Sequence, residues 1–283
     1  MQSLLSIMKS MLRFLPLNME TYRTKVSIKY TMRYILLYFC LMVSQAWANS
    51  HALYSYDTKE YLDKQDVESI RSIASITKLF TAMTILESKS NLDDRIRVGC
   101  QSSGKIIRNT EMTRRDLLTA MIVSSDNCAA ETLANNYPNG YNNFITERTN
   151  LIQKIGLKNT KLYDATGLSV FNSSTVSDLI VFAPIAYANP VLRSIANLPN
   201  ATVKAFKKGK EIVIKVHNTN SLVYNHKEVV ISKTGFTNSA GRCMLIMTKR
   251  LENFYAIVVL GEPNIKSRNR QVERLLDYEN KNR

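Results

Sequence analysis

The sequence has few of the residues that mark loose or heavily cross-linked chains. It holds 9 glycines, 6 prolines and 4 cysteines among 283 residues, and they are spread along the chain. This spread excludes a collagen-like repeat and a low-complexity linker, and no repeat of solenoid period is present. With 45% hydrophobic and 22% charged residues, the chain predicts a packed core, because disordered chains lack that apolar content.

The sequence also lacks the residue clusters of a metal or nucleic-acid site. Its histidines, His51, His217 and His226, have no ligand-like spacing, and no C-x-x-C pair exists, so we expect no metal and no cofactor. Six of the 38 basic residues and one of the 23 acidic residues precede position 49, which leaves a net charge of about +10 for the remainder. No recognisable binding motif accompanies these basic residues, and we predict no nucleic-acid partner.

The run MRYILLYFCLMVSQAWA, which starts at Met32, has the features of a secretory signal peptide. Basic residues flank its apolar segment, residues 35–43, and this segment is shorter than the roughly 20 residues that span a bilayer. We predict a leader over residues 1–48, with the signal peptide at about 32–48. Residues 1–31 resemble neither a globular element nor a good leader, which makes Met32 an alternative start of translation. The protein is then exported, to the periplasm or cell-envelope space.

Three cysteines follow the leader: Cys100, Cys128 and Cys243. At least one of them must be free, because the number is odd. A chain of about 235 residues builds a core without disulfides, so we expect Cys128 and Cys243 to be small buried apolar residues. The alternative for Cys128, which follows a candidate site motif, is a thiol open to oxidation or alkylation.

Apolar periodicity predicts a mixed fold. Residues 52–56 and 61–63 flank a polar turn and predict a hairpin. Apolar residues recur at helical spacing within 73–86 and predict a buried helix. Residues 114–123 predict a second helix with Thr113 as its N-cap. The polar residues 124–127 interrupt the helical pattern, which resumes afterwards and ends at Tyr137–Gly140.

The last third of the chain changes to strand-like runs. Asn264 caps a predicted closing helix whose Val272, Leu275 and Leu276 would pack on the sheet. A hairpin, helices, antiparallel strands and a final helix, in that order, predict an α+β fold in one domain over residues 49–283. The strand-like runs are Glu211–Val216, Val229–Ser232, Cys243–Thr248 and Phe254–Leu260.

Three short segments carry candidate chemistry, and each alone occurs often by chance. Their order matters, because a serine acyl-transfer site without histidine needs a nucleophile, an amine base and further polar groups. The segments are Ser75-Ile76-Thr77-Lys78, Ser125-Asp126-Asn127 and Lys233-Thr234-Gly235.

Ser75 and Lys78 are the candidate nucleophile and base. Residues three apart lie on one face of a helix, so the amine can reach the hydroxyl. A free lysine with a pKa of about 10.4 is a poor base at neutral pH, and its pKa must fall by roughly three units. We expect burial to supply part of this fall and a second cation, Lys233, to supply the rest. The helix N-terminus would offer backbone N–H groups to an oxyanion.

The other two segments fit supporting roles. We expect Ser125 to relay a proton to the leaving amine and Asn127 to hold a substrate amide or the lysine, although either residue taken in isolation is better explained as a helix cap.

In the third segment, Lys233 and Thr234 would bind a substrate carboxylate, and Gly235 would permit close backbone approach. The N–H of Phe236 would complete an oxyanion hole. The alternative for this segment is a strand end with a turn glycine.

The three motifs together resemble the signature of the penicillin-binding protein and serine β-lactamase superfamily. Between Ala52 and Leu260 the longer segments SIASITKLFTAM, SSDNCAAETLA, ATGLSVFNSSTVSDL, HNTNSLVY and SKTGFTNSAGRC resemble low-molecular-mass D-alanyl-D-alanine peptidases, in particular endopeptidases of the penicillin-binding protein 7 type. The resemblance implies a three-layer fold in which helices flank an antiparallel sheet of about five strands.

The resemblance also implies the activity. Ser75 would form an acyl-enzyme with the peptide stem of peptidoglycan, either at a cross-link or at a terminal D-alanine, and β-lactams would acylate the same serine as inhibitors. The chain ends soon after the closing helix, without the extra β domain and membrane helix of many carboxypeptidases, so we expect a soluble or peripherally bound protein. The basic run Lys204–Lys210 is either a contact to membrane or wall or a solvated hairpin tip.

Two other functions share these motifs. A serine β-lactamase of the common class places a glutamate and an asparagine between the second and third motifs, but Glu131, Glu147 and Glu211 have no E-x-x-L-N context here. The remaining alternative is a non-catalytic protein that binds β-lactams or the wall.

Overall fold

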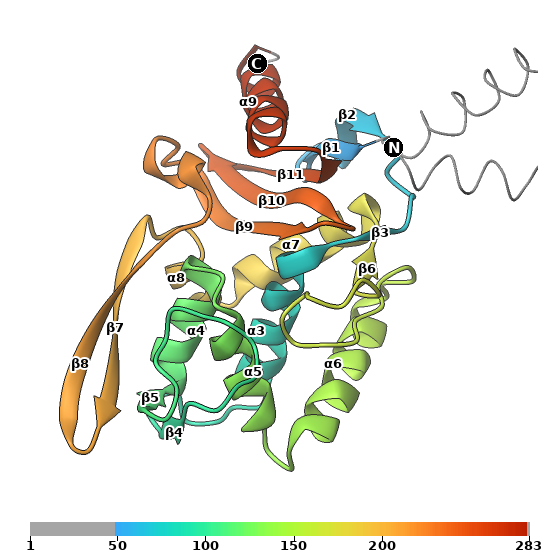
Figure 1. Cartoon of the computed structure of the whole chain (residues 1–283). Helices are drawn as coiled ribbons and strands as arrows, with labels where there is room; N and C mark the ends of the chain where they lie inside the picture. Colours follow the sequence, from blue (N-terminus) through green and yellow to red (C-terminus); the bar gives the residue numbers. More distant parts are fainter. Residues whose placement is uncertain (1–48, 282–283) are drawn as a thin grey trace, which may run out of the picture. The chain divides into compact units, whose positions relative to one another are not determined.

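The main sheet of the protein has five antiparallel strands in the order β2-β1-β11-β10-β9 (Figure 1). The computed structural model describes residues 49–281, so the predicted leader lies outside the described residues. The expected opening hairpin and the expected five-strand sheet are both confirmed. The strands are β1 (Ser50–Ser55), β2 (Glu60–Gln65), β9 (Val229–Thr237), β10 (Gly241–Arg250) and β11 (Asn253–Glu262).

Helices cover both faces of this sheet (Figure 1). Helix α9 (Ile265–Lys281) packs on one face and α7 (Val176–Ala188) on the other. Successive side chains of a strand point to opposite faces, so in β10 Met244 and Ile246 join the core under α9. Leu245 joins the larger core on the side of α7. The two cores make the three layers that the α+β prediction requires.

Two helices of the candidate site, α4 and α5, begin at polar capping residues. Thr113 accepts a 3.0 Å hydrogen bond from the Asp116 N–H at the start of α4, and Asp126 accepts one of 2.8 Å from Ala129 at the start of α5. The predicted interruption at 124–127 is therefore the junction of two helices. The helices of this half are α3 (Thr77–Glu87), α4 (Arg114–Val123), α5 (Asn127–Asn135), α6 (Tyr141–Ile155) and α8 (Pro190–Ile195), and a 3₁₀ turn (Ala74–Ile76) precedes α3.

A second sheet of four strands, in the order β4-β5-β7-β8, includes the predicted run Glu211–Val216 and is separate from the main sheet. Its long hairpin, β7 to β8, extends at the lower left of Figure 1. The strands are β4 (Arg95–Arg97), β5 (Glu111–Thr113), β7 (Asn200–Lys207) and β8 (Lys210–His217), and a short pair joins β3 (Arg71–Ser72) to β6 (Ser173–Ser174). Within residues 49–281, no helix has the length and apolarity to cross a membrane.

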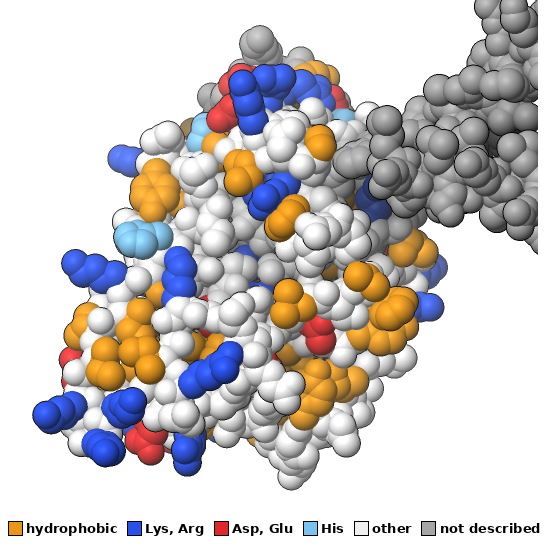
Figure 2. Space-filling model, in the orientation of Figure 1, with side chains coloured by type: hydrophobic (Ala, Val, Ile, Leu, Met, Phe, Trp, Pro, Cys, Tyr) orange, Lys and Arg blue, Asp and Glu red, His pale blue; other side chains and the backbone are white. Residues whose placement is uncertain are grey.

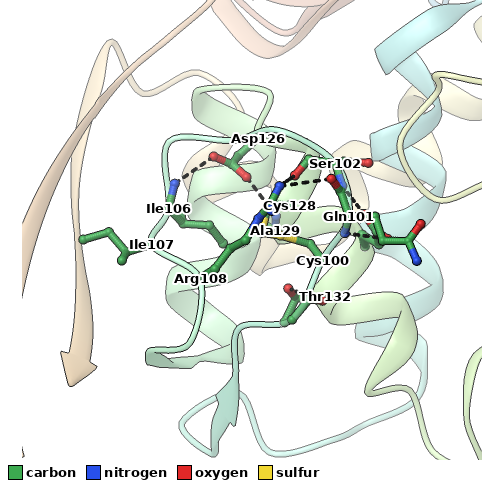
Figure 3. Close-up of a disulfide and its surroundings, with 12 residues drawn as sticks. Cys100, Gln101, Ser102, Ile106, Ile107, Arg108, Asp126, Cys128, Ala129 and Thr132 are labelled. Carbon is green, nitrogen blue, oxygen red and sulfur yellow. Dashed lines mark hydrogen bonds between the residues drawn. A yellow bond between two sulfur atoms is a disulfide. The ribbon is translucent and has the colours of Figure 1, made fainter. Parts of the chain in front are cut away.

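The cysteines differ in part from the prediction. Cys128 is buried in the core as expected, and it forms a disulfide with Cys100, with Cα atoms 5.2 Å apart (Figure 3), a pairing that the sequence did not identify. Their pairing depends on the loop between β4 and β5 folding back over α5, a tertiary contact that the odd cysteine count does not reveal. Cys243 is free and buried in β10, as predicted for a strand-core residue.

Candidate active site

Ser75 and Lys78 lie side by side at the start of the buried helix. Ser75 belongs to the 3₁₀ turn before α3, and Lys78 follows one turn later with its Nζ 2.9 Å from Ser75 Oγ. The Lys78 side chain is fully buried. Its Nζ also donates to Asn127 Oδ1 at 2.7 Å and to the backbone oxygen of Thr166 at 2.5 Å. Three contacts therefore fix the amine beside the serine hydroxyl.

The buried position of Lys78 accounts for its proton affinity. Burial lowers the pKa of Lys78 to about 7, although the negative charges of Asp164 and Asp126 oppose this fall. Repulsion between the two lysines acts on Lys233 instead. Burial, followed by the charge of Lys78, holds the pKa of Lys233 well below its usual range. Desolvation, rather than the second cation expected from the sequence, is thus the main cause for Lys78.

Ser125 connects the second motif to the third. Lys233 Nζ donates to Ser125 Oγ at 2.8 Å and to the backbone oxygen of Thr234 at 2.9 Å. Ser125 has a φ of 57°, a left-handed conformation that costs energy outside glycine and is common at functional sites. Thr234 Oγ1 lies 2.6 Å from Oγ1 of Thr219. The three motifs, far apart in the sequence, therefore meet in space.

Gly235 of β9 lies close to Ser75, the candidate nucleophile. A Cβ built on Gly235 would be 2.8 Å from the backbone oxygen of Ile73 and 3.0 Å from the N atom of Ser75, so no larger residue fits without a shift. Strand β9 is an edge strand of the main sheet. Edge strands keep unpaired N–H and C=O groups on their free side, which a peptide substrate can use. Phe236, the next residue, is 44% exposed.

Residue types alone did not identify the loop of residues 164–172, which contacts the Lys78 amine through the backbone oxygen of Thr166. The carboxylate of Asp164 accepts hydrogen bonds from the backbone N–H groups of Thr166, Gly167 and Ser169. The fully buried Arg148 donates to the backbone oxygen of Asp164 at 2.5 Å. This arrangement positions the Thr166 carbonyl against Lys78. A backbone carbonyl has no side-chain signature, and the segment ATGLS was notable only through the family resemblance.

A cavity of about 480 Å³ opens over Ser75. Two arginines that the sequence did not single out, Arg242 and Arg268, supply cations to its wall, whereas Lys233 lies behind it. Burial, followed by repulsion from Arg242, lowers the pKa of Arg268 to about 10, so Arg268 stays charged at neutral pH. The lining residues are Ser75, Ser125, Thr219, Ser221, Thr234, Gly235, Phe236, Arg242, Ile265 and Arg268.

The disulfide fastens a loop onto the helix that begins with Asn127. Figure 3 shows Cys100 and its neighbours lying over the start of α5, with the Asp126 carboxylate turned toward the loop. Asp126 accepts from the N–H groups of Lys105 and Ile106, and Glu131 accepts from Ser102 at 2.9 Å. The covalent bond and the two carboxylates together hold the residues beside Lys78 in place.

A serine and a buried lysine on a three-layer α+β fold define the class of penicillin-binding serine peptidases. A family model described as D-alanyl-D-alanine carboxypeptidase, peptidase S11, matches residues 41–264, and the chain belongs to this family. The resemblance found in the sequence is thereby confirmed.

Curated relatives agree with this membership. The chain is 34% identical to a D-alanyl-D-alanine endopeptidase of Pseudomonas aeruginosa, over 78% of this chain and 73% of that protein. It is 31% identical to the D-alanyl-D-alanine endopeptidase of Escherichia coli, over 75% and 71% of the two chains.

Solved structures share the fold. A single-site mutant of the Streptomyces K15 DD-transpeptidase superposes with a TM-score of 0.75 at 25% identity, over 81% of this chain and 96% of that one. Penicillin-binding protein D2 of Listeria monocytogenes, in an ampicillin-bound form, gives a TM-score of 0.72 at 28% identity, over 82% and 96%.

Proposed function

We propose that this protein is a serine peptidase that cleaves D-alanyl-D-alanine-type bonds in peptidoglycan stem peptides, with cross-links as its preferred substrate, and that β-lactams acylate it. The observation that carries the proposal is the buried amine of Lys78 beside Ser75 Oγ. The endopeptidase relatives support the preference for cross-links. The β-lactam-bound structural relative supports acylation by these drugs.

Acylation begins with a proton transfer. Neutral Lys78 takes the proton of the Ser75 hydroxyl while Oγ attacks the carbonyl carbon of a D-alanine residue. This attack forms a tetrahedral intermediate. The backbone N–H groups of Ser75 and Phe236 are the donors that we assign to its oxyanion. Both belong to segments that pack closely together, the 3₁₀ turn and β9.

Collapse of the intermediate breaks the C–N bond and releases the amine of the second peptide. The proton taken up by Lys78 must reach that nitrogen, and we assign Ser125 as the relay. Lys233 donates to Ser125 Oγ, which orients this hydroxyl. Water then attacks the ester carbonyl and gives a proton to Lys78. Lys78 passes this proton to Ser75 Oγ as the ester bond breaks, so the peptide leaves as a carboxylic acid and the Ser75 hydroxyl is restored.

The wall of the cavity suits a carboxylate. Thr234 offers a hydroxyl, and Arg242 and Arg268 line the same space with positive charge. Lys233 lies behind Thr234, where its Nζ donates to the Thr234 oxygen at 2.9 Å. We assign Asn127 to hold the lysine, with which it forms a 2.7 Å hydrogen bond.

We further propose that residues 49–283 act as one peptidase domain after export behind the leader at 1–48. The disulfide between Cys100 and Cys128 supports export, because disulfides persist in oxidising compartments outside the cytosol.

A β-lactamase needs a base that drives rapid deacylation. The described contacts of the glutamates between the second and third motifs lead elsewhere: Glu131 accepts backbone N–H groups of the 99–109 loop and Glu211 pairs with Lys204. Glu147 is exposed on α6, and Glu228 pairs with His226 at 3.1 Å and with Arg250 at 2.8 Å. These contacts favour slow release of the acyl group.

The test incubates the purified protein and a Ser75→Ala variant with defined cross-linked dimers, pentapeptide monomers and a penicillin. We expect dimer cleavage and a covalent penicillin adduct on Ser75, both absent in the variant. Equal activity of the variant would refute the mechanism. Rapid penicillin turnover would instead indicate a β-lactamase, and an adduct without peptide cleavage would indicate a binding protein.

A further inference from the structure

The positive charge of the chain is concentrated on the second sheet. The four strands and the two-residue tip of its hairpin contain seven lysines and arginines and two glutamates, a net charge of +5 in 24 residues. Residues 49–283 carry about +10 in total. About a tenth of these residues therefore holds about half of their net charge. The basic residues are Arg95, Arg97, Lys204, Lys207, Lys208, Lys210 and Lys215.

The hairpin presents these charges to solvent. In β7, Val203 and Ala205 are buried and Lys204 between them is exposed, so the strand alternates between the core and the outside, and Lys207, at the hairpin tip, is exposed as well. Lys208 and Gly209 have φ values of 50° and 77°, as a two-residue hairpin turn requires. Lys and Arg side chains gather over this hairpin at the lower left of Figure 2.

Few carboxylates neutralise this surface. Glu211 pairs with Lys204 at 3.1 Å, and both side chains are about half exposed, so solvent screens the pair. Arg95 stacks over the ring of Phe206 at 3.5 Å and keeps its charge available. Exposed and mostly unneutralised cations along a sheet and its hairpin tip fit a polymer with repeated negative groups.

The base of the hairpin adjoins the cavity. Strand β8 ends at His217, and Thr219, two residues later, lines the cavity. The N–H of Thr219 donates to the Val123 oxygen at 3.1 Å, which fixes the hairpin base to the helix before Ser125. The eight residues of β8 extend over roughly 27 Å, so the hairpin tip lies well away from the cavity in which the scissile peptide bond would bind.

We propose that the exposed cations of the β4-β5-β7-β8 sheet and of its hairpin tip bind the peptidoglycan polymer itself, at carboxylates of stem peptides next to the one being cut. Peptidoglycan repeats free carboxylates along each strand, and a charged surface beside the cavity would hold the enzyme on this insoluble substrate. The inference rests on the proposed function and adds a second contact between the enzyme and the same peptidoglycan substrate, outside the cavity.

The test compares two variants that lose the same charge. In the hairpin variant Lys204, Lys207, Lys210 and Lys215 are changed to Gln; in the control Lys154, Lys158, Lys161 and Lys227, also exposed, are changed to Gln. Binding to purified sacculi is measured at several salt concentrations, together with penicillin acylation. Parallel binding assays use sacculi with amidated carboxylates and vesicles of anionic phospholipid.

We expect the hairpin variant to bind sacculi at least about tenfold more weakly, because each lysine near a charged surface contributes on the order of fivefold. Its acylation rate should stay within twofold of the parent. The control should bind like the parent, and amidated sacculi should bind all three proteins weakly.

Three results would overturn the proposal: unchanged binding of the hairpin variant, an equal loss in the control, or hairpin-dependent binding to vesicles but not to sacculi. A parent protein that is not acylated by penicillin would contradict the proposed function instead, so the two failures are distinguishable.

Discussion

The amine of Lys78 donates a 2.5 Å hydrogen bond to the backbone carbonyl of Thr166. This carbonyl can only accept, and so can Asn127 Oδ1 on the other side of the amine. A neutral amine has two N–H bonds and one lone pair. When both N–H bonds point to these acceptors, the lone pair is left facing Ser75, which is the orientation that a general base needs.

The rate of acylation should therefore follow the protonation of Lys78. Because burial lowers the pKa of Lys78 to about 7, the second-order rate of penicillin acylation should rise with pH, reach half its maximum near pH 7 and level off above it. Stopped-flow or mass-spectrometric kinetics from pH 5.5 to 9 would measure this. A flat profile, or a midpoint near the ordinary lysine value, would contradict the assignment.

The same pKa predicts a trend in stability. Lys78 binds a proton more weakly in the folded state than in the unfolded state, where its pKa is 10.5. The unfolded chain therefore holds more protons between about pH 7 and 10.5, and the contribution of Lys78 to the free energy of unfolding rises across that window. Urea titrations of the parent and a Lys78→Met variant should differ in this slope.

The Asp164→Asn variant should show two separate effects of the Asp164 carboxylate, one on the stability of its loop and one on the pKa of Lys78. Burial raises the pKa of Asp164, but hydrogen bonds from Gly167, Ser169 and Thr166 outweigh it, so the native carboxylate is ionised. Loss of these charge-assisted bonds should lower the free energy of unfolding by about 3 kcal/mol. The Asp164 charge also raises the pKa of Lys78, so the midpoint of the acylation profile should move to lower pH.

Asp178→Asn serves as the control for this shift, because Asp178 binds Asn159 and Thr160 at 2.8 and 2.7 Å rather than the site. It should cost stability without moving the profile. A midpoint that stays in place in Asp164→Asn would show that the charge of Asp164 does not act on the base.

Gly235→Ala should slow acylation much more than it lowers stability. The new Cβ would meet the Ile73 oxygen at 2.8 Å and the Ser75 N atom at 3.0 Å, so β9 and the nucleophile must move apart. A displacement of about 1 Å costs on the order of a hundredfold in rate. Gly99→Ala, at an exposed glycine with nothing within 4 Å of its Cβ and no left-handed backbone, controls for the loss of a glycine. Acylation of Gly235→Ala at the parental rate would count against the site geometry.

Reduction of the disulfide should loosen the site without removing any of its side chains. Cys100 and Cys128 are 28 residues apart, and opening such a loop costs roughly 3.5 kcal/mol in the chain-entropy model. Dithiothreitol should lower the urea midpoint of the parent and its acylation rate. A Cys100→Ser/Cys128→Ser variant should show the same losses and no response to the reductant. Cys243→Ala should respond like the parent, since Cys243 is unpaired.

Side-chain patterns predicted those parts of the structure that depend on side chains alone. The helix from Arg114 to Val123, its Thr113 cap and the buried strand around Ala256 follow from apolar spacing and polar caps, and all are observed. The approach of Ser75 to Lys78 followed from helical spacing. The motif order and the family resemblance identified the strand that carries Lys233.

The rest depended on tertiary contacts. The Thr166 carbonyl is a main-chain group, and its role appears only once the 164–172 loop is packed beneath α3. Arg268 reaches the cavity from the closing helix, which the sequence presents only as an apolar stripe. The origin of the low pKa of Lys78 was assigned partly to Lys233, because burial depth cannot be calculated before the surrounding core is known.

The position of β1 in the main sheet also bears on how the chain acquires its structure. β1 lies between β2, which follows it directly, and β11, where Ser50 pairs with Leu260, so the earliest described strand finds its second neighbour only when nearly the whole chain is present. Such high contact order slows folding and leaves the central strands exposed meanwhile. An unfinished chain of this protein can pair β1 only with β2, and Ser75 and Lys78 meet the Lys233 segment of β9 only after most of the chain has been made.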